Sequence, residues 1–327
     1  NGHGGKEGFA ESTGMVEILK ESAVQFGGKV IKVTDHGADP ESRSNDDSAA
    51  VKKAIKEAKD GDIIYFPPGS YLLKEQIDIT SKSVKILGPG ADKATIYAGY
   101  NIEGDLFKIR GGPCEITGLC FEQHRQKGKV KGGFIEFNSD TMETGAYKIY
   151  IHGNKFYQSV SRPKMRSYDY SIYVGSTYGA RIENNYFDSG SMLCVHGSNK
   201  VYFKNNEGLM NVYVGVYYHV ASSIFTNVDF LDISNNKVWG KGATEETSGE
   251  LKTDQFTAGR VFTIQGWSTD NYIAHNDVKR CGVTGTNAGE IILYENLGFN
   301  YDGGVETATK DSITTPETSK NKTVSAS

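Results

Sequence analysis

A basic insertion at residues 157–170 carries side chains that are suited to acid–base chemistry. Lys164 and Arg166 are candidates for a base. Tyr173 and His196 lie in the strand-like segments that follow, and either can donate or position a proton. Such a set can remove a proton from carbon and protonate a leaving oxygen, provided that a cation neutralises the acid group beside that carbon. This is the chemistry of β-elimination.

Carboxylates offer a second chemistry, the hydrolysis of a glycosidic bond by one protonated and one ionised acid. Asp169 and Asp254 are the best placed, because each ends an insertion that leads into a strand. Glu136 and Glu295 are the remaining candidates. Elimination and hydrolysis both stay open, and we favour elimination because the first insertion is basic.

The elements that must position these groups are short strands in which apolar and polar residues alternate. We expect one sheet to contain segments 106–110, 134–138, 171–175, 192–196, 212–216, 261–265 and 291–295. The alternation predicts inward side chains at Phe107, Ile109, Ile135, Phe137, Ile172, Val174, Leu193, Val195, Phe262 and Ile264. A shift of one residue would exchange the inward and outward sets.

The outward strip combines cations, a carboxylate, amides, an imidazole and aromatic rings. Outside the catalytic set it contains Lys108, Arg110, Glu136, Asn138, Tyr217, His219, Gln265 and Trp267. Aromatic faces stack on sugar rings and charged groups bind carboxylates or hydroxyls, so these residues are candidates for substrate binding. An ordinary solvated sheet face also contains lysine, glutamate and tyrosine, and that interpretation stays open. Basic runs beside the strip favour an anionic polysaccharide as the partner.

Asparagines recur after short strands along the chain. The last of each group are Asn154, Asn185, Asn206, Asn236 and Asn276. The shortest spacing is about twenty residues, the length of one bare repeat, and longer spacings hold insertions. Such repeats predict a solenoid in which each coil buries its apolar face against its neighbours. Stacked asparagines would share hydrogen bonds along a ladder.

The stretch from Lys29 to Leu73 predicts a strand, a helix near residues 46–59 and another strand. The helix carries an apolar stripe and begins at Asn45, Asp46, Asp47 and Ser48, whose side-chain oxygens can bind its unpaired backbone donors. The motifs D-x-G-A, an Asp pair before A-x-x-x-A-I, and Y-F-P-P-G-x-Y resemble the opening of pectate-lyase-like proteins, which include polysaccharide lyases, polygalacturonase-type hydrolases and phage tailspikes. The resemblance implies an all-β fold, a right-handed parallel β-helix (β-solenoid) with an N-terminal α-helical cap.

The resemblance extends in part to catalytic motifs. Residues 161–166 resemble part of the pectate lyase R-x-P-x-x-R motif, whose last arginine is the base, and this implies that role for Arg166. The first arginine of that motif is displaced to Arg162. Of the hydrolase motifs N-T-D, D-D, G-H-G and R-I-K, the chain has G-H-G only at residues 2–4, and its Asp46-Asp47 pair lies in the cap.

The resemblance implies a carbohydrate-active protein, first a polysaccharide lyase acting on an acidic, uronate-containing chain. The alternatives are a glycoside hydrolase and a non-catalytic glycan-binding or structural module, such as a phage spike. A monomer or homotrimer and an extracellular or virion-associated location are implied in the same way. No secretion signal is recognisable in the sequence.

Composition limits the partners and cofactors. A net charge of −4 and a pI near 6.0 give no overall attraction to nucleic acid, and no apolar run is long enough to span a membrane. The histidines show no zinc spacing, whereas Ca²⁺ stays open because aspartates of separate coils can share an ion. The cysteines Cys114, Cys120, Cys194 and Cys281 are expected as buried thiols, and only Cys114 and Cys120 are close enough to suggest a disulfide.

Three regions are expected along the chain. Residues 1–28 form a tail with a short helix, residues 29–300 form the β-helix, and residues 301–327 form a hairpin and a linker-like tail. The composition of that tail, rich in threonine, serine and lysine, suggests a longer parent protein.

Overall fold

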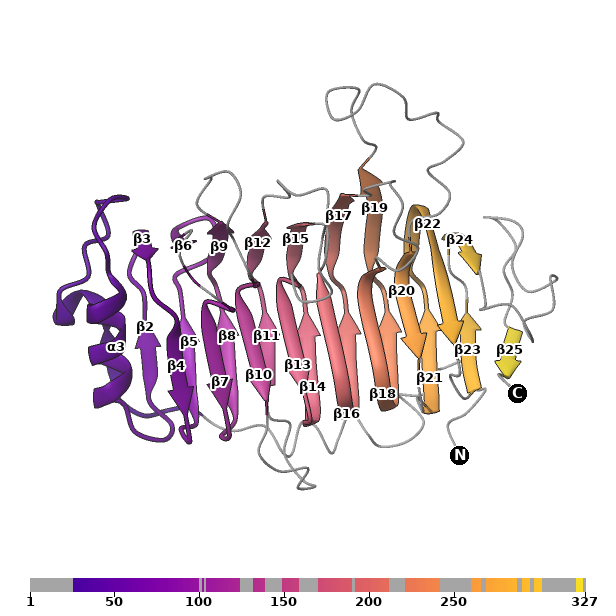
Figure 1. The fold of residues 1–327 in the computed structure, drawn as a ribbon, viewed down its shortest axis with the longest axis horizontal. Coiled ribbons are helices and arrows are strands. Elements are labelled where there is room, and N and C mark those ends of the chain that lie inside the picture. The colour runs from indigo at the N-terminus through magenta and orange to yellow at the C-terminus, as the bar shows by residue number, and fades with distance from the viewer. Residues whose placement is uncertain are drawn as a thin grey trace.

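The structure is a computed structural model that describes residues 26–99, 102, 104–123, 132–138, 149–158, 170–189, 192–211, 221–241, 260–265, 269–286, 290–294, 297–301 and 322–325. Within these residues the chain forms a stack of coils built from parallel strands, with helix α3 at the N-terminal end (Figure 1). The fold is therefore the parallel β-helix that the sequence predicts. The short helix expected before residue 26 lies outside the described residues.

Helix α3 (Ser48–Glu57) covers the open apolar end of the first coils (Figure 1). Its stripe of Ala50, Val51, Ala54 and Ile55 is buried, as its helical spacing predicts. The Lys82 ammonium donates to the carbonyl oxygens of Ile55 and Ala58, each at 2.7 Å. These carbonyls have no partner inside the helix, so Lys82 completes its C-terminal end.

The acidic turn before α3 acts differently from the prediction. The Asp47 carboxylate does not cap the helix but accepts the backbone N–H groups of Asp39 (2.8 Å) and Leu72 (3.1 Å). Asp46 Oδ1 accepts the Ser48 N–H at 3.0 Å, so Asp46 serves the helix start. Through these two hydrogen bonds, Asp47 instead connects the loop that contains Asp39 to the strand that contains Leu72.

Each coil contributes strands to three stacks of parallel pairs. The first stack contains β4 (Ile77–Thr80), β7 (Phe107–Arg110), β10 (Ile135–Asn138), β13 (Ile172–Gly175), the first parts of β16 (Leu193–Lys204) and β18 (Ala221–Ser234), β20 (Arg260–Gln265) and the end of β22 (Asp277–Thr286). A short 3-10 helix, η1 (Val33–His36), follows the first strand of the chain.

The second stack contains β1 (Val30–Lys32), β2 (Ile63–Tyr65), β5 (Val84–Leu87), β8 (Cys114–Thr117), β11 (Ile149–His152), β14 (Tyr178–Glu183), the later parts of β16 and β18, β21 (Thr269–Ala274) and β23 (Glu290–Tyr294). The third contains β3 (Gly69–Leu73), β6 (Ala94–Ala98), β9 (Cys120–Gln123), β12 (Lys155–Tyr157), β15 (Tyr186–Ser189), β17 (Glu207–Asn211), β19 (Lys237–Lys241), the start of β22 and β24 (Leu297–Tyr301). Strand β25 (Lys322–Ser325) pairs antiparallel with β23.

The predicted alternation of the first stack is confirmed from β7 to β16. The expected inward side chains are buried: Phe107, Ile109, Ile135, Phe137, Ile172, Val174, Leu193 and Val195. Segment 261–265 is part of strand β20, but the side chains of Phe262 and Ile264 lie outside the description.

Two predicted strands need correction. The partners of Leu193–His196 in the next coil are residues 223–226 of β18, whereas segment 212–216 lies outside the described residues. Segment 291–295 was assigned to the wrong stack, because Ile291 to Tyr294 pair with residues 271–274 of β21 in the second stack. Strands of both stacks have similar length and composition, so alternation alone does not distinguish them.

The asparagine ladder is confirmed. Asn185 Oδ1 accepts the Asn154 N–H at 3.1 Å, Asn206 Oδ1 accepts that of Asn185 at 3.0 Å, and Asn236 and Asn276 continue the series at 2.9 Å. Each Nδ2 donates to a backbone carbonyl of the previous coil, as Asn206 does to Ile182 at 2.9 Å. All these side chains are buried, so the ladder satisfies backbone groups that water cannot reach.

The residue before each ladder asparagine has a left-handed backbone, with φ of 55° at Asn184, 54° at Asn205 and 57° at Asn235. Asparagine tolerates this conformation better than other residues with a Cβ. The paired asparagines therefore have separate functions, one in the turn and one in the ladder. Next to the ladder, Phe121, Phe156 and Phe187 stack face to face inside the coils, with ring centroids 5.1 and 5.0 Å apart.

The described cysteines carry free thiols. Cys114 and Cys120 are buried and unbridged, so the disulfide that their spacing suggested is not formed. Burial raises the pKa of Cys120 to about 11. The side chain of Cys281 and residues 302–321, which include most of the expected C-terminal hairpin, lie outside the description.

Candidate active site

The outward face of the first stack, which we call the first face, presents two adjacent rows of residues. One row contains Lys108, Glu136, Tyr173 and Cys194. The other contains Arg110, Asn138, Gly175 and His196. Parallel strands lie about 4.8 Å apart, so each row brings together side chains that are far apart in the sequence.

Gly175 is the centre of the first face. A Cβ on Gly175 would lie 2.3 Å from Asn138 Oδ1 and 3.2 Å from the Tyr173 hydroxyl oxygen. Asn138 and Tyr173 therefore lean over the glycine from two sides. His196 pairs in register with Gly175 on the next strand, and its side chain is exposed. A phenol and an amide thus approach one position without a side chain, and a histidine lies in register beside it on the next strand.

Glu136 is held by its neighbours on the first face. Its Oε1 accepts a hydrogen bond from Asn138 Nδ2 at 2.8 Å, and its Oε2 lies 3.7 Å from Lys108 Nζ. Because of these contacts, Glu136 is positioned to accept hydrogen bonds from ligand hydroxyls. Cys194 offers no reactive thiolate, because burial raises its pKa to about 12.

The sequence matches the family described as "Rhamnogalacturonase A/epimerase, pectate lyase-like" over residues 30–300. The chain belongs to this family. Its membership of the rhamnogalacturonase A/epimerase family agrees with the parallel β-helix that the structure shows. A comparison with curated proteins gives no significant match.

Similar solved structures include ORF18 of Geobacillus virus E2, at 13% identity and a TM-score of 0.43, where the match covers 85% of this chain and 62% of that one. The A-module of the Azotobacter vinelandii mannuronan C-5 epimerase AlgE6 has 15% identity and a TM-score of 0.40, covering 83% and 75%. An exopolygalacturonase from Thermotoga maritima has 10% identity and a TM-score of 0.41, covering 88% and 95%. The chain thus spans less than two thirds of the viral protein.

Many of the predicted site residues lie outside the described residues. They are Lys164, Arg166, Asp169, Tyr217, His219, Asp254, Trp267 and Glu295. The first three belong to the segment that connects β12 to β13, the strand that carries Tyr173. Strand β20 places the backbone of Gln265 in register with Thr226, the partner of His196. The described structure thus brings together Lys108, Arg110, Glu136, Asn138, Tyr173 and His196.

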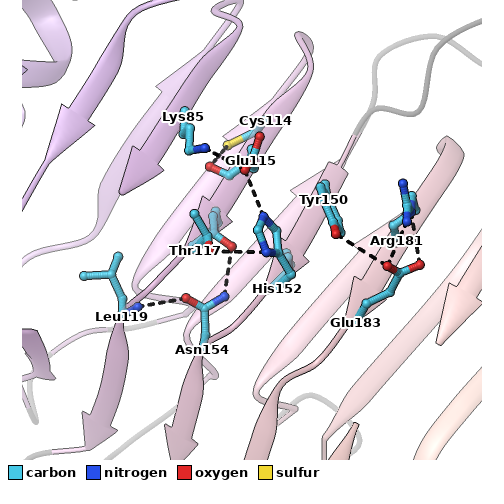
Figure 2. A network of polar contacts seen from close by, with 12 residues as sticks. Lys85, Cys114, Glu115, Thr117, Leu119, Tyr150, His152, Asn154, Arg181 and Glu183 are labelled. Atoms are coloured by element: carbon cyan, nitrogen blue, oxygen red, sulfur yellow. Dashed lines mark hydrogen bonds and ion pairs between the residues drawn. The ribbon is translucent and has the colours of Figure 1, made fainter. Parts of the chain in front are cut away.

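The second stack carries a polar network on its outward face that the sequence analysis did not assign (Figure 2). We call it the second face, and it contains Lys85, Glu115, Thr117, Tyr150, His152, Arg181, Glu183, Tyr202, Lys204 and Asp232. Period-two alternation in the strands before each ladder asparagine would have placed these side chains outward.

Glu115 is central to the first part of the second face. Its Oε1 lies 2.9 Å from Lys85 Nζ and 2.8 Å from His152 Nε2, and His152 Nδ1 lies 3.3 Å from Thr117 Oγ1 (Figure 2). Burial opposes ionisation of Glu115, but hydrogen bonds from His152 and Lys85 hold its pKa below the ordinary value. The carboxylate therefore stays charged at neutral pH.

Further along the second face, Arg181 donates to both oxygens of Glu183, at 3.0 and 2.8 Å, and lies over the Tyr150 ring (Figure 2). Lys204 Nζ lies 3.3 Å from Asp232 Oδ2. Burial raises the pKa of Asp232, while Lys204 opposes that shift. The charges of the second face are thus balanced by one another.

The described residues do not form a metal site. Within the ranges that the structure describes, no three His, Cys, Asp or Glu side chains come together to hold an ion. On the first face, Asp78 and Glu136 are in register with Lys108 on either side of it, and the Glu136 oxygens are near Asn138 and Lys108. The mechanism proposed below therefore uses only side chains of the protein. Over the same ranges, no helix has the length and apolar character needed to cross a membrane.

Proposed function

We propose that this protein is a polysaccharide lyase that cleaves an acidic, uronate-containing chain by β-elimination along the first face. The observation that carries the proposal is the register that places Lys108 and Arg110 on β7, Tyr173 on β13 and His196 on β16 along one outward face. Cations for a carboxylate and groups that move protons thus occupy one surface.

The reaction needs a base, an acid and a cation. The base removes the C5 proton, the electrons of the C–H bond form the C4–C5 double bond, and the C4–O bond breaks. We assign the base to Arg166 or Lys164, on the segment that leads to β13. Tyr173 or His196 protonates the leaving oxygen or positions it, and Lys108, in the same row as Tyr173, stabilises the charge that develops on the carboxylate.

The exposure of His196 and the position of Tyr173 favour these two residues for these roles. The His196 side chain is exposed, and an imidazole can donate a hydrogen bond from one ring nitrogen while it accepts one at the other. The Tyr173 phenol leans toward Gly175, beside His196 in the register. A sugar placed over Gly175 would meet both groups. An extracellular or virion-associated location, with a glycan as partner, belongs to the same proposal.

The test is ultraviolet absorbance of the unsaturated uronate product, with polygalacturonate, alginate, glycosaminoglycans and neutral glucans as substrates. Reducing ends are assayed in parallel, with Ca²⁺ or EDTA added. We expect absorbance to rise with an acidic polymer, and we expect Arg166→Ala, Tyr173→Phe or His196→Gln to reduce the rate at least about tenfold. His152→Gln on the second face is the matched control and should leave the rate unchanged.

Other outcomes would overturn the proposal in specific ways. Reducing ends without absorbance would indicate hydrolysis, with Glu136, Asp169 and Asp254 as the carboxylates to test. Loss of the rate with EDTA would add a metal to the mechanism. Binding of a glycan without any product would support a non-catalytic glycan-binding or spike module.

A further inference from the structure

Arg110 is the cation at the end of strand β7 on the first face. Its side chain is exposed at the end of β7, and its guanidinium has no carboxylate or hydrogen-bond partner among the described residues. Its partners in register, Thr80 on β4 and Asn138 on β10, are neutral. An open arginine fork therefore faces solvent beside the amide of Asn138.

The neighbouring cation is not open in this way. Lys108 Nζ lies 3.7 Å from Glu136 Oε2, and the Lys108 side chain is 27% exposed. An incoming anion at Lys108 would meet the Glu136 carboxylate as well. Arg110 is therefore the better place on the first face for an anionic group.

On the second face, three cations are each paired with a carboxylate. Lys85 is paired with Glu115 at 2.9 Å, Arg181 with Glu183 at 2.8 Å and Lys204 with Asp232 at 3.3 Å. These three cations are thus neutralised, whereas Arg110 has no such carboxylate among the described residues.

We propose that Arg110 is a subsite for the carboxylate of a sugar that is not the one undergoing reaction. The inference rests on the proposed function, because it assumes that an acidic polysaccharide lies along the first face. Arginine binds a carboxylate through two parallel hydrogen bonds, which fixes the orientation of the sugar as well as its charge.

The register fixes how far this subsite lies from the reacting groups. Strands β7, β10, β13 and β16 are successive, so the backbones of Arg110 and His196 are separated by about 14 Å at the usual strand spacing. That distance exceeds the span of one sugar ring. A chain laid along the stack therefore places a different sugar at Arg110 than at Tyr173 and His196, toward the N-terminal end of the solenoid.

The substrate class follows from this separation. The ligand must carry carboxylates on sugars other than the reacting one, as a continuous uronate polymer does. A short oligomer that occupies only the reacting position would not reach Arg110. Dependence on Arg110 should therefore appear only when the oligomer is long enough to span the two positions.

The test is calorimetric binding of a dimer, a tetramer and a hexamer of galacturonate, and of the corresponding alginate oligomers, to the whole chain. Binding is measured in the His196→Gln background, and absorbance confirms that no ligand is consumed. Arg110→Gln removes the fork and Arg110→Lys keeps the charge. Arg43→Gln is the matched control, because it removes the same charge from an exposed arginine that lies over Tyr97 on the third stack.

We expect Arg110→Gln to weaken tetramer and hexamer binding by about tenfold or more, the effect of losing a charge-assisted hydrogen-bond pair. The affinity of Arg110→Lys for the tetramer and the hexamer should lie between those of wild type and Arg110→Gln. Dimers, and tetramers whose carboxyl groups have been reduced to alcohols, should show less than about a twofold change, since neither places a carboxylate at Arg110.

Three results would overturn the inference. They are an Arg110→Gln effect no larger than that of Arg43→Gln, equal loss for dimer and hexamer, and no binding of any acidic oligomer. Failure of the proposed function is separate. If no polymer is cleaved but long acidic oligomers still need Arg110, the subsite is supported and the elimination proposal fails.

Discussion

The space where Gly175 lacks a side chain is occupied by the amide oxygen of Asn138, which would lie 2.3 Å from a Cβ at that position. The same Cβ would lie 3.0 Å from Cε1 of Tyr173. The glycine therefore allows Asn138 to reach over β13 while its Nδ2 group binds Glu136 at 2.8 Å. The arrangement of the first face depends on this single missing side chain.

We expect Gly175→Ala to displace Asn138 and Tyr173 and to lower the free energy of unfolding by about 1–3 kcal/mol through overpacking. Chemical denaturation measures the loss. The sharper check is a double-mutant cycle, because in the Asn138→Ala background the oxygen that clashes is gone and the cost should shrink. An unchanged cost in that background would contradict the proposed contact.

The inward residues of the first stack could be predicted because burial follows a local period of two. Phe107 and Ile109 needed no knowledge of the coil to which they belong. The stack to which a strand belongs depends on where the chain bends, and residues 291–294 were misplaced for that reason. Strand β16 shows the same limit, since it runs from the first stack into the second without interruption.

Asp47 and Gly175 show why the candidate site could be predicted only in part. Asp47 has a typical capping position, yet it binds the distant Leu72 N–H, a partner that no local pattern reveals. Similarly, Tyr173 and His196 could be assigned to one face by alternation. The reason for a glycine at position 175 is the close approach of Asn138 from another coil, which the sequence does not reveal. Types and faces were predictable, whereas contacts between coils were not.

The ladder predicts different roles for adjacent asparagines. Asn206→Ala removes bonds to the carbonyl of Ile182 and to the N–H of Asn185, and leaves both buried, so we expect a loss of about 3 kcal/mol in unfolding free energy. Asn205→Gly is the control, because glycine adopts the left-handed φ of 54° easily and should change stability by less than about 1 kcal/mol. Similar losses for both variants in urea denaturation would contradict the separate roles.

The cap predicts an effect of a lysine outside the helix. Lys82→Met keeps the length of the side chain but removes the ammonium that donates to the carbonyls of Ile55 and Ala58. We therefore expect the free energy of unfolding to fall by about 1–2 kcal/mol. Lys53→Met removes the same charge from an exposed position on α3 and should have little effect. Thermal unfolding of the two variants gives the comparison, and equal melting temperatures would contradict the cap.

Tyr202 predicts a substitution that increases stability. Its hydroxyl is buried and has no hydrogen-bond partner among the described residues, so Tyr202→Phe removes the cost of desolvating that group and should raise the free energy of unfolding by about 1 kcal/mol. Tyr71→Phe is the matched comparison, since the Tyr71 hydroxyl donates to the Pro67 carbonyl at 2.8 Å and its loss should cost about 1 kcal/mol. If denaturation shows that Tyr202→Phe also destabilises the protein, its hydroxyl has a bound partner such as an ordered water.

Glu115 predicts a stability contribution that depends on pH. Its folded pKa lies below the ordinary value, because the hydrogen bonds from His152 and Lys85 outweigh the effect of burial. The unfolded state then binds more protons than the folded state, so the contribution is present above the ordinary glutamate pKa of about 4.3 and is lost as pH falls through the lower folded pKa. We expect the free energy of unfolding of wild type to exceed that of Glu115→Gln by about 1 kcal/mol at neutral pH. This difference should shrink in acid. Urea denaturation of both proteins across this range measures it, and a difference that grows on acidification would show that the sign of the shift is wrong.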